Sequence, residues 1–147
     1  NFEPISTLIS QIERRNSFSR LSYCKTFSYN QSIQARIEAK NEGFNDALLL
    51  NTQGKLCCGT TANILVKRGS NWLTPSLNSG CLPGIMRQRG IDFNIIKETL
   101  LEVSPEDGDE WFLINSLSCH PILQIDTQKL TIATNPEDFW LSLLDNR

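Results

Sequence analysis

Short apolar runs, each bounded by small or turn-forming residues, are the sequence feature that most restricts how this chain can fold. The runs cover residues 46–51, 61–69, 71–75 and 109–116. Runs of this length between Gly, Ser, Thr and Asn residues are typical of β-strands. The turn Thr52-Gln53-Gly54 predicts a hairpin that joins the first run to residues 55–58. The turn at Arg68-Gly69 likewise predicts that 71–75 pairs with the strand before it.

Helical patterns lie between the predicted strands. Residues 30–43 contain good helix formers, place Ile33, Ile37 and Ala35 or Ala39 near one face and stop at Gly43. Helix formers resume over 85–98, where Gly90 costs about 1 kcal/mol relative to alanine. A short helix is therefore expected after residue 84.

The end of the chain predicts a last helix over 135–147. Asn135 is suited to the N-cap, and Pro136 is tolerated in the first turn, where its missing N–H is not needed. Strands with interspersed helices indicate a mixed α/β domain, and 147 residues are enough for one domain with a sizeable core.

Composition excludes several classes of function. The net charge is −2 and no basic stripe is present, which argues against a nucleic-acid partner. No apolar run approaches the length needed to span a membrane. The first residues lack the basic, apolar and small-residue order of a secretory signal. Because the chain starts with Asn, we expect a processed or truncated product.

The cysteines predict free thiols rather than a metal site. The five are Cys24, Cys57, Cys58, Cys81 and Cys119. An odd number without a secretory signal is typical of a reducing compartment, so we expect a cytoplasmic protein. A zinc site needs repeated ligand pairs two to four residues apart, but here the close pair is vicinal and the single histidine is His120. We expect no metal site, and buried thiols at Cys24, Cys81 and Cys119.

The segment Leu-Pro-Gly-Ile-Met-Arg at 82–87 is a candidate anion site. Gly84 permits close approach of a ligand, and the residues after it open a helix whose N-terminal end favours negative charge. Many loops end in glycine before a helix, so this pattern alone does not identify a ligand. Residues 115–117 offer a second set of small donors, while Arg87 and Arg89 are expected to be solvated.

Four motifs follow one another in a fixed order over residues 22–122. They are Lys-Thr…Tyr at 25–29, Gly-x-Leu-x-x-Gly-x-x-x-Asn at 54–63, Leu-Pro-Gly-Ile-x-Arg at 82–87, and Phe-Leu-x-Asn-Ser-Leu…Pro at 112–121. This order resembles the fold-type-IV pyridoxal-phosphate enzymes, the class IV aminotransferase family. That family includes branched-chain and D-amino-acid aminotransferases and 4-amino-4-deoxychorismate lyases. The segments CGTTANIL, PGIMRQ and FLINSL are most similar to the lyases, and branched-chain enzymes usually carry Thr where Met86 stands.

The resemblance implies a fold and a domain organisation. The chain would be the C-terminal lobe of the D-amino-acid aminotransferase-like fold, a strand-rich pseudo-barrel with flanking helices. Residues 1–21 would be the end of the N-terminal lobe and the connector between the lobes. Residues 22–147 would be the lobe that binds pyridoxal 5'-phosphate. The resemblance also implies a homodimer and a small-molecule substrate.

The resemblance also implies roles for individual residues. Lys25 would bond to the cofactor and, once released, move the α-proton of the substrate, a use that suits a lysine of lowered pKa. Tyr29 would hydrogen-bond the phenolic oxygen of the cofactor. The backbone amides of Ile85 and Met86 would hold its phosphate, with help from Ser116. Taken alone, these residues also fit a solvated lysine, a half-buried core tyrosine and a strand-end turn.

Cys58 stands where the family normally carries glutamate, whose carboxylate keeps the pyridine nitrogen protonated. A neutral thiol is a weak partner, and a buried thiol is expected to resist ionisation. Transamination should suffer most from this change, whereas a lyase reaction is driven by formation of an aromatic product. Together with the resemblance, Cys58 favours a lyase that would convert 4-amino-4-deoxychorismate to 4-aminobenzoate and pyruvate in folate synthesis. The alternatives are a branched-chain or D-amino-acid aminotransferase, or a non-catalytic relic without cofactor.

Overall fold

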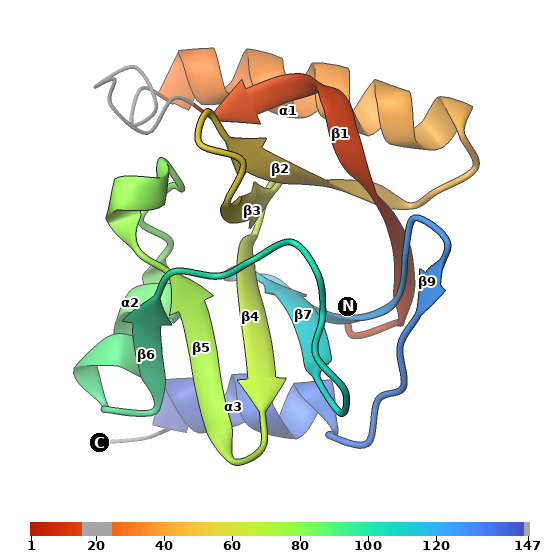
Figure 1. Cartoon of the computed structure of the whole chain (residues 1–147). Coiled ribbons are helices and arrows are strands. Elements are labelled where there is room, and N and C mark those ends of the chain that lie inside the picture. Colours follow the sequence, from red (N-terminus) through yellow and green to blue (C-terminus); the bar gives the residue numbers. More distant parts are fainter. Residues whose placement is uncertain (16–24, 146–147) are drawn as a thin grey trace.

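The computed structural model describes the backbone of residues 1–15 and 25–145. In that part of the chain, nine strands form one sheet and three α-helices flank it (Figure 1). Cys24 lies outside the described residues, and so does the side chain of Lys25. No helix within the described ranges is long and apolar enough to cross a membrane.

The elements follow one another in mixed order. They are β1 (Ile5–Arg15), α1 (Lys25–Asn41), β2 (Asp46–Asn51), β3 (Leu56–Gly59), β4 (Asn63–Arg68), β5 (Asn71–Pro75), the 3-10 turn Leu77–Ser79, α2 (Ile85–Asp92), β6 (Ile96–Thr99), β7 (Glu110–Ile114), β8 (Cys119–Ile125), β9 (Gln128–Lys129) and α3 (Pro136–Asp145).

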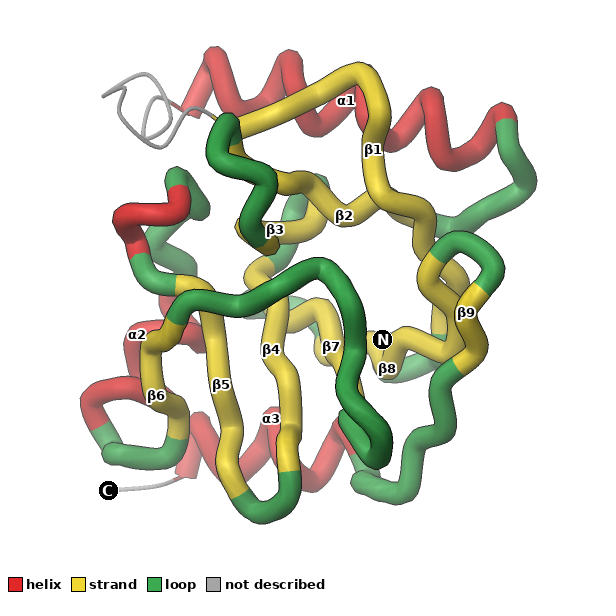
Figure 2. Tube along the Cα trace, viewed as in Figure 1, coloured by secondary structure: helices red, strands yellow, loops and turns green. Residues whose placement is uncertain are grey.

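The sheet curves into the pseudo-barrel that the resemblance implied. Its strand order is β3, β2, β1, β8, β7, β4, β5, β6, with β9 paired to β8, and β3 also pairs with β4. This last pairing, Cys58 opposite Asn63, joins the two ends of a six-strand ring (Figure 2). β1 runs parallel to both of its neighbours, whereas most other pairs are antiparallel.

Both predicted hairpins are confirmed. β2 and β3 pair antiparallel with Leu49 opposite Cys58, and β4 and β5 pair with Val66 opposite Leu73. Gly54, in the first turn, has φ +77°, a backbone conformation that suits glycine. β2, β3 and most of β4 are buried because one face packs in the barrel and the other against helices or loops.

The helix expected after residue 84 is short, as predicted, but the segment after it is a strand. α2 ends at Asp92, and residues 96–99 form β6 beside β5. Glycine is needed at position 90 for packing, which the sequence did not indicate. A Cβ placed there would lie 2.2 Å from Cδ1 of Ile96, so glycine lets the helix and the strand approach closely.

Helices cover the two ends of the barrel in Figure 1. Ala35 and Ala39 of α1 are fully buried and pack with Leu49, while Ile33 and Ile37 face outward. α3 begins as predicted, because the N–H of Asp138 donates to Oδ1 of Asn135 at 3.1 Å.

Four strands were not predicted: β1, β6, β8 and β9. β1 lies inside the range assigned to the connector, yet it pairs with β2 and β8 in the common sheet. Its sequence, ISTLISQIERR, is largely polar, which hides the strand pattern. The division of the chain into lobes at residue 21 stays a prediction.

Candidate functional site

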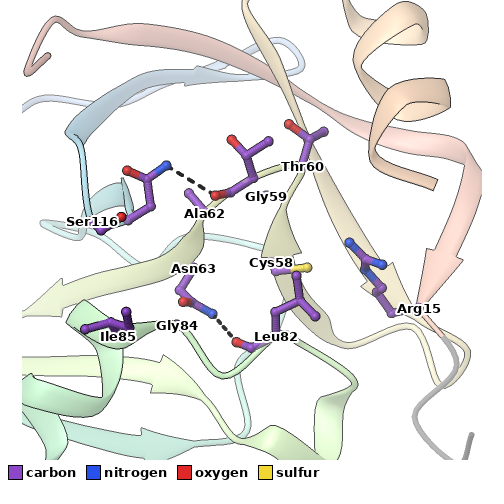
Figure 3. Close-up of a pocket in the computed structure, with 12 residues that line it drawn as sticks. Arg15, Cys58, Gly59, Thr60, Ala62, Asn63, Leu82, Gly84, Ile85 and Ser116 are labelled. Carbon is purple, nitrogen blue, oxygen red and sulfur yellow. Dashed lines mark hydrogen bonds between the residues drawn. The ribbon is translucent and has the colours of Figure 1, made fainter. Parts of the chain in front are cut away.

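A cavity of about 170 Å³ lies where the β3–β4 turn, the loop before α2 and the turn after β7 meet (Figure 3). Arg15, at the end of β1, also lines it. The lining residues are Arg15, Cys58, Gly59, Thr60, Thr61, Ala62, Asn63, Leu82, Gly84, Ile85, Asn115 and Ser116. The β3–β4 pairing that closes the barrel thus also builds the cavity.

The N-terminus of α2 opens into this cavity. Gly84 is its N-cap residue, with φ −66° and ψ 148°, and none of the described side chains caps the helix through a hydrogen bond. The first N–H groups of a helix have no partner within the helix, so those of Ile85 and Met86 are suited to an anion.

Gly84 is held against β4 so closely that a side chain would not fit. A Cβ there would lie 2.1 Å from Oδ1 of Asn63. The amide Nδ2 of Asn63 donates to the backbone oxygen of Leu82 at 2.9 Å, which fastens the loop before α2 to the barrel (Figure 3). The strand β4 therefore fixes where the helix terminus lies.

Asn115 orders the opposite rim of the cavity. Its Nδ2 donates to the backbone oxygen of Thr61 at 3.2 Å. Its Oδ1 accepts from the N–H of Leu117 at 2.9 Å and from the hydroxyl of Ser118 at 3.0 Å. Ser116 is thereby held at the rim of the cavity, where it is exposed.

The floor of the cavity consists of Cys58 and Arg15. Cys58 is 3% exposed and Arg15 1% exposed. Arg15 donates from Nη1 to Oε1 of Gln31 at 3.0 Å and from Nη2 to the hydroxyl of Ser32 at 3.2 Å. Its Nε finds no hydrogen-bond partner among the described residues. Figure 3 shows the sulfur of Cys58 and the guanidinium of Arg15 pointing toward each other.

These surroundings favour the ionised form of Cys58 more than burial alone would. A hydrogen bond from Cys57 and the positive charge of Arg15 lower the pKa of Cys58 to about 7, although burial and Asp46 act in the opposite direction. The expectation that a buried thiol resists ionisation holds for the other described thiols. The pKa of Cys57 is raised by its hydrogen bond to Cys58 and by burial, and burial raises the pKa of Cys119 to about 12. Cys57, Cys58, Cys81 and Cys119 are free and buried, which confirms the prediction for Cys81 and Cys119.

A second group of contacts fixes the turn between β3 and β4. The hydroxyl of Thr60 donates to Oδ1 of Asp46 at 2.6 Å, and the hydroxyl of Ser32 donates to the backbone oxygen of Thr60. Asp46 also pairs with Arg36 at 3.1 Å. Asp46 is thus engaged by these groups, and its charge is partly compensated away from the cavity.

The predicted site residues are distributed between the cavity and its surroundings. Cys58, Ile85 and Ser116 line the cavity. The side chain of Met86 is 2% exposed and packs in the core, so only its backbone belongs to the helix terminus. Tyr29 is 64% exposed and lines an adjacent groove that shares Thr60, Thr61 and Leu82 with the cavity. Lys25 is the first residue of α1.

Arg15 was not predicted as a site residue, and the prediction that Arg87 is solvated is wrong. The signal for Arg15 was weak, an Arg-Arg pair in a stretch assigned to a connector. Arg87, expected to be solvated, is 1% exposed. Its Nη2 donates to the backbone oxygen of Pro75 at 3.0 Å and to Glu98, so it joins α2 to β5 and β6.

Comparison with known proteins adds relatives of two kinds. A protein from Aquifex aeolicus, named as a branched-chain-amino-acid aminotransferase, is 32% identical over 112 residues, which are 70% of this chain and 36% of the relative. A protein from Schizosaccharomyces pombe, named as an aminodeoxychorismate lyase, is 32% identical over 100 residues, or 64% of this chain and 43% of the relative.

Solved structures share the fold. One from Legionella pneumophila, titled as a 4-amino-4-deoxychorismate lyase, has a TM-score of 0.83 at 24% identity and covers 99% of this chain and 56% of its own. The PLP form of a branched-chain aminotransferase from Thermobaculum terrenum has a TM-score of 0.82 at 24% identity, over 96% of this chain and 51% of its own. The chain therefore spans about half the length of these structures.

The family itself follows from a match over most of the chain. The family described as amino-transferase class IV matches residues 2–125, a range that includes the helix terminus of α2, Cys58 and the turn after β7. The chain belongs to the class IV aminotransferase family.

Proposed function

We propose that this chain is the cofactor-binding lobe of a pyridoxal-phosphate enzyme, and that the enzyme converts 4-amino-4-deoxychorismate to 4-aminobenzoate and pyruvate. The observation that carries the proposal is the cavity in which an uncapped helix N-terminus faces an arginine–cysteine floor. The family and the relative from Schizosaccharomyces pombe support it.

The residues around the cavity fit the phosphate of the cofactor. The N–H groups of Ile85 and Met86 and the dipole of α2 would hold its negative charge, and Ser116 would add a hydroxyl from the opposite rim. Gly84 lets the side chain of Asn63 pack against the loop before α2, which fixes the position of these N–H groups. The cradle is thus built from backbone groups and a small side chain.

When bound, pyridoxal phosphate supplies an electron-withdrawing ring that stabilises negative charge at the α-carbon of the substrate. The residues of this chain would orient that ring and move protons. Lys25 would hold the cofactor covalently and then carry the α-proton on its Nζ. Tyr29 would donate from its hydroxyl to the phenolic oxygen. Cys58 would face the ring nitrogen with its sulfur, and Arg15 would hold negative charge on that sulfur.

Cys58 also bears on the choice between the lyase reaction and transamination. Although its pKa is lowered, the thiol of Cys58 is a weaker acid than glutamate, whose ordinary pKa is about 4.3. A partner of this strength favours the reaction that needs less stabilisation of the α-carbon. That reaction is the lyase reaction, since formation of an aromatic ring drives it.

A branched-chain aminotransferase is the second candidate. The 32% identity to the Aquifex aeolicus protein over 112 residues favours it. The discriminating assay is direct. A lyase forms pyruvate and aminobenzoate without an amino acceptor, whereas an aminotransferase exchanges amino groups between an amino acid and a keto acid.

The first experiment is an absorbance spectrum after addition of pyridoxal phosphate, followed by borohydride reduction and peptide mapping. We expect a visible band and a reduced pyridoxyl group on Lys25. Absence of both, in a folded protein of the full length of its relatives, would identify a relic that no longer binds the cofactor. Sedimentation of the loaded protein would test the homodimer that we also propose.

A further inference from the structure

Arg15 is a buried cation whose described hydrogen-bond partners are neutral. Its guanidinium contacts the amide oxygen of Gln31 and the hydroxyl of Ser32, and its Nε is left without a partner within the described ranges. None of the ion pairs in the described part of the chain includes Arg15. Burial of an unpaired guanidinium is costly, so a nearby group that can take negative charge will be favoured in its charged form.

The group that faces Arg15 across the cavity floor is Cys58 (Figure 3). Among the described residues, three other titratable groups surround this thiol: Asp46 of β2, Cys57 of β3 and Cys81 of the loop before α2. Asp46 is already engaged by Thr60 and Arg36, and Cys57 accepts a hydrogen bond from Ser79 at 3.7 Å. Negative charge at this place is therefore best accommodated on the sulfur of Cys58.

A thiolate beside a guanidinium is the reactive form of cysteine. The cavity gives a small molecule a route to it, because Cys58 forms part of the lining although its exposure to bulk solvent is slight. Cys119 is the buried thiol with which Cys58 can be compared in the same chain. It is buried in the core against Phe112 and Ile114, where burial alone raises its pKa to about 12.

We propose that Cys58 is a site of reversible oxidation by small neutral peroxides, activated by Arg15. The sulfur attacks one peroxide oxygen, an S–O bond forms and the O–O bond breaks. The second oxygen leaves as hydroxide and takes up a proton to become water. The sulfur is oxidised by two electrons to the sulfenic acid, the peroxide is reduced, and a thiol reductant restores the cysteine. The added oxygen occupies the cavity floor, so oxidation controls what the cavity can hold.

The test uses hydrogen peroxide on the chain without added cofactor, between pH 5.5 and 9, so its outcome does not depend on the proposed function. The reaction is stopped by unfolding in dimedone, and the label is mapped by mass spectrometry. We expect label on Cys58, little on Cys119, and a rate that rises with a midpoint near pH 7. Arg15→Gln should slow labelling of Cys58 at pH 7 at least tenfold, because a thiol of ordinary pKa, about 8.5, has a roughly 16-fold smaller thiolate fraction there.

Two further variants serve as controls for Arg15→Gln. Arg15→Lys retains the charge and should restore most of the rate. Arg14→Gln removes the exposed neighbour on the same strand and should change nothing. Equal labelling of Cys58 and Cys119 in the unaltered chain, or equal rates in Arg15→Gln and Arg14→Gln, would overturn the proposal. If Arg15→Gln does not fold, a midpoint near pH 9 for Cys58 in the unaltered chain would overturn it as well.

Discussion

At the scale of single residues, the chemistry of the site depends on a pair that is distant in the sequence. Cys58 is adjacent to Cys57, and both are buried in the same cluster, yet one pKa is lowered and the other raised. Arg15 accounts for part of this difference because its charge reaches the floor of the cavity. The identity of the residue at position 58 should therefore affect both the reaction and the stability.

Cys58→Glu should test how position 58 sets the reaction. Its carboxylate, with an ordinary pKa of about 4.3, would stay ionised beside Arg15 and act as a stronger partner for a ring nitrogen. We expect the lyase rate to stay unchanged and transamination to rise at least tenfold in cofactor-loaded protein. Cys58→Gln, of the same size but uncharged, is the control and should not gain transamination. Loss of the lyase rate in Cys58→Glu would show that the thiol has a positive role.

The pH dependence of stability should report the same ionisation. The folded pKa of Cys58, about 7, lies below the ordinary value of 9.0, so between these pH values the unfolded chain binds more protons. The contribution of Cys58 to stability is then present above pH 9 and lost as the pH falls through 7. We expect the difference in unfolding free energy between the unaltered chain and Cys58→Ser to grow from pH 6.5 to 9. A difference that is independent of pH, measured with urea, would contradict this.

At the scale of elements, the N-terminus of α2 lies at the cavity because β4 holds the loop before it. Gly84 has a backbone conformation that alanine also adopts, so its requirement for glycine comes from Asn63 alone. The sequence predicted the loop, the glycine and the short helix, because these have local signatures. It could not predict that the side chain of Asn63 presses on Gly84, because that contact joins two elements.

Gly84→Ala should therefore weaken the site through packing. The new Cβ would displace Asn63 and break its hydrogen bond to Leu82, at a cost of about 1–3 kcal/mol of stability. Binding of pyridoxal phosphate, followed by absorbance, should weaken in parallel. The double variant Gly84→Ala with Asn63→Ala removes the clash. It should be less damaging than the sum of the two single changes, and simple additivity would contradict the packing explanation.

β1 could not be predicted because neither its composition nor its place along the chain marks it as a strand. β1 is polar in sequence, and its parallel partners β2 and β8 are distant from it along the chain. A strand with parallel partners has no turn signal to mark it, whereas the hairpins β2–β3 and β4–β5 do. The same reason explains why Arg15 was missed: its place on the cavity floor follows from the position of β1 in the sheet.

At the scale of the whole molecule, closure of the barrel and formation of the cavity are one event. The ring closes through a short pairing between β3 and β4, and the turn between these strands lines the cavity. Contacts to α1 and β2 hold that turn, through Ser32 and Asp46. A change that weakens the β3–β4 pairing should therefore disturb the cavity at a lower free-energy cost than unfolding of the whole chain.

Thr60→Val tests this coupling, because valine keeps the shape of threonine and removes the hydroxyl that donates to Asp46. Thr60 is 3% exposed, so the lost hydrogen bond should cost about 1–3 kcal/mol. If closure and site are one unit, amide hydrogen exchange should speed up first at the ends of β3 and β4, and cofactor binding should weaken while α3 stays protected. Thr74→Val is the matched control, since its buried hydroxyl donates to the backbone oxygen of Ile64 away from the cavity. Equal exchange at β3–β4 in both variants would mean that the turn is not what holds the barrel closed.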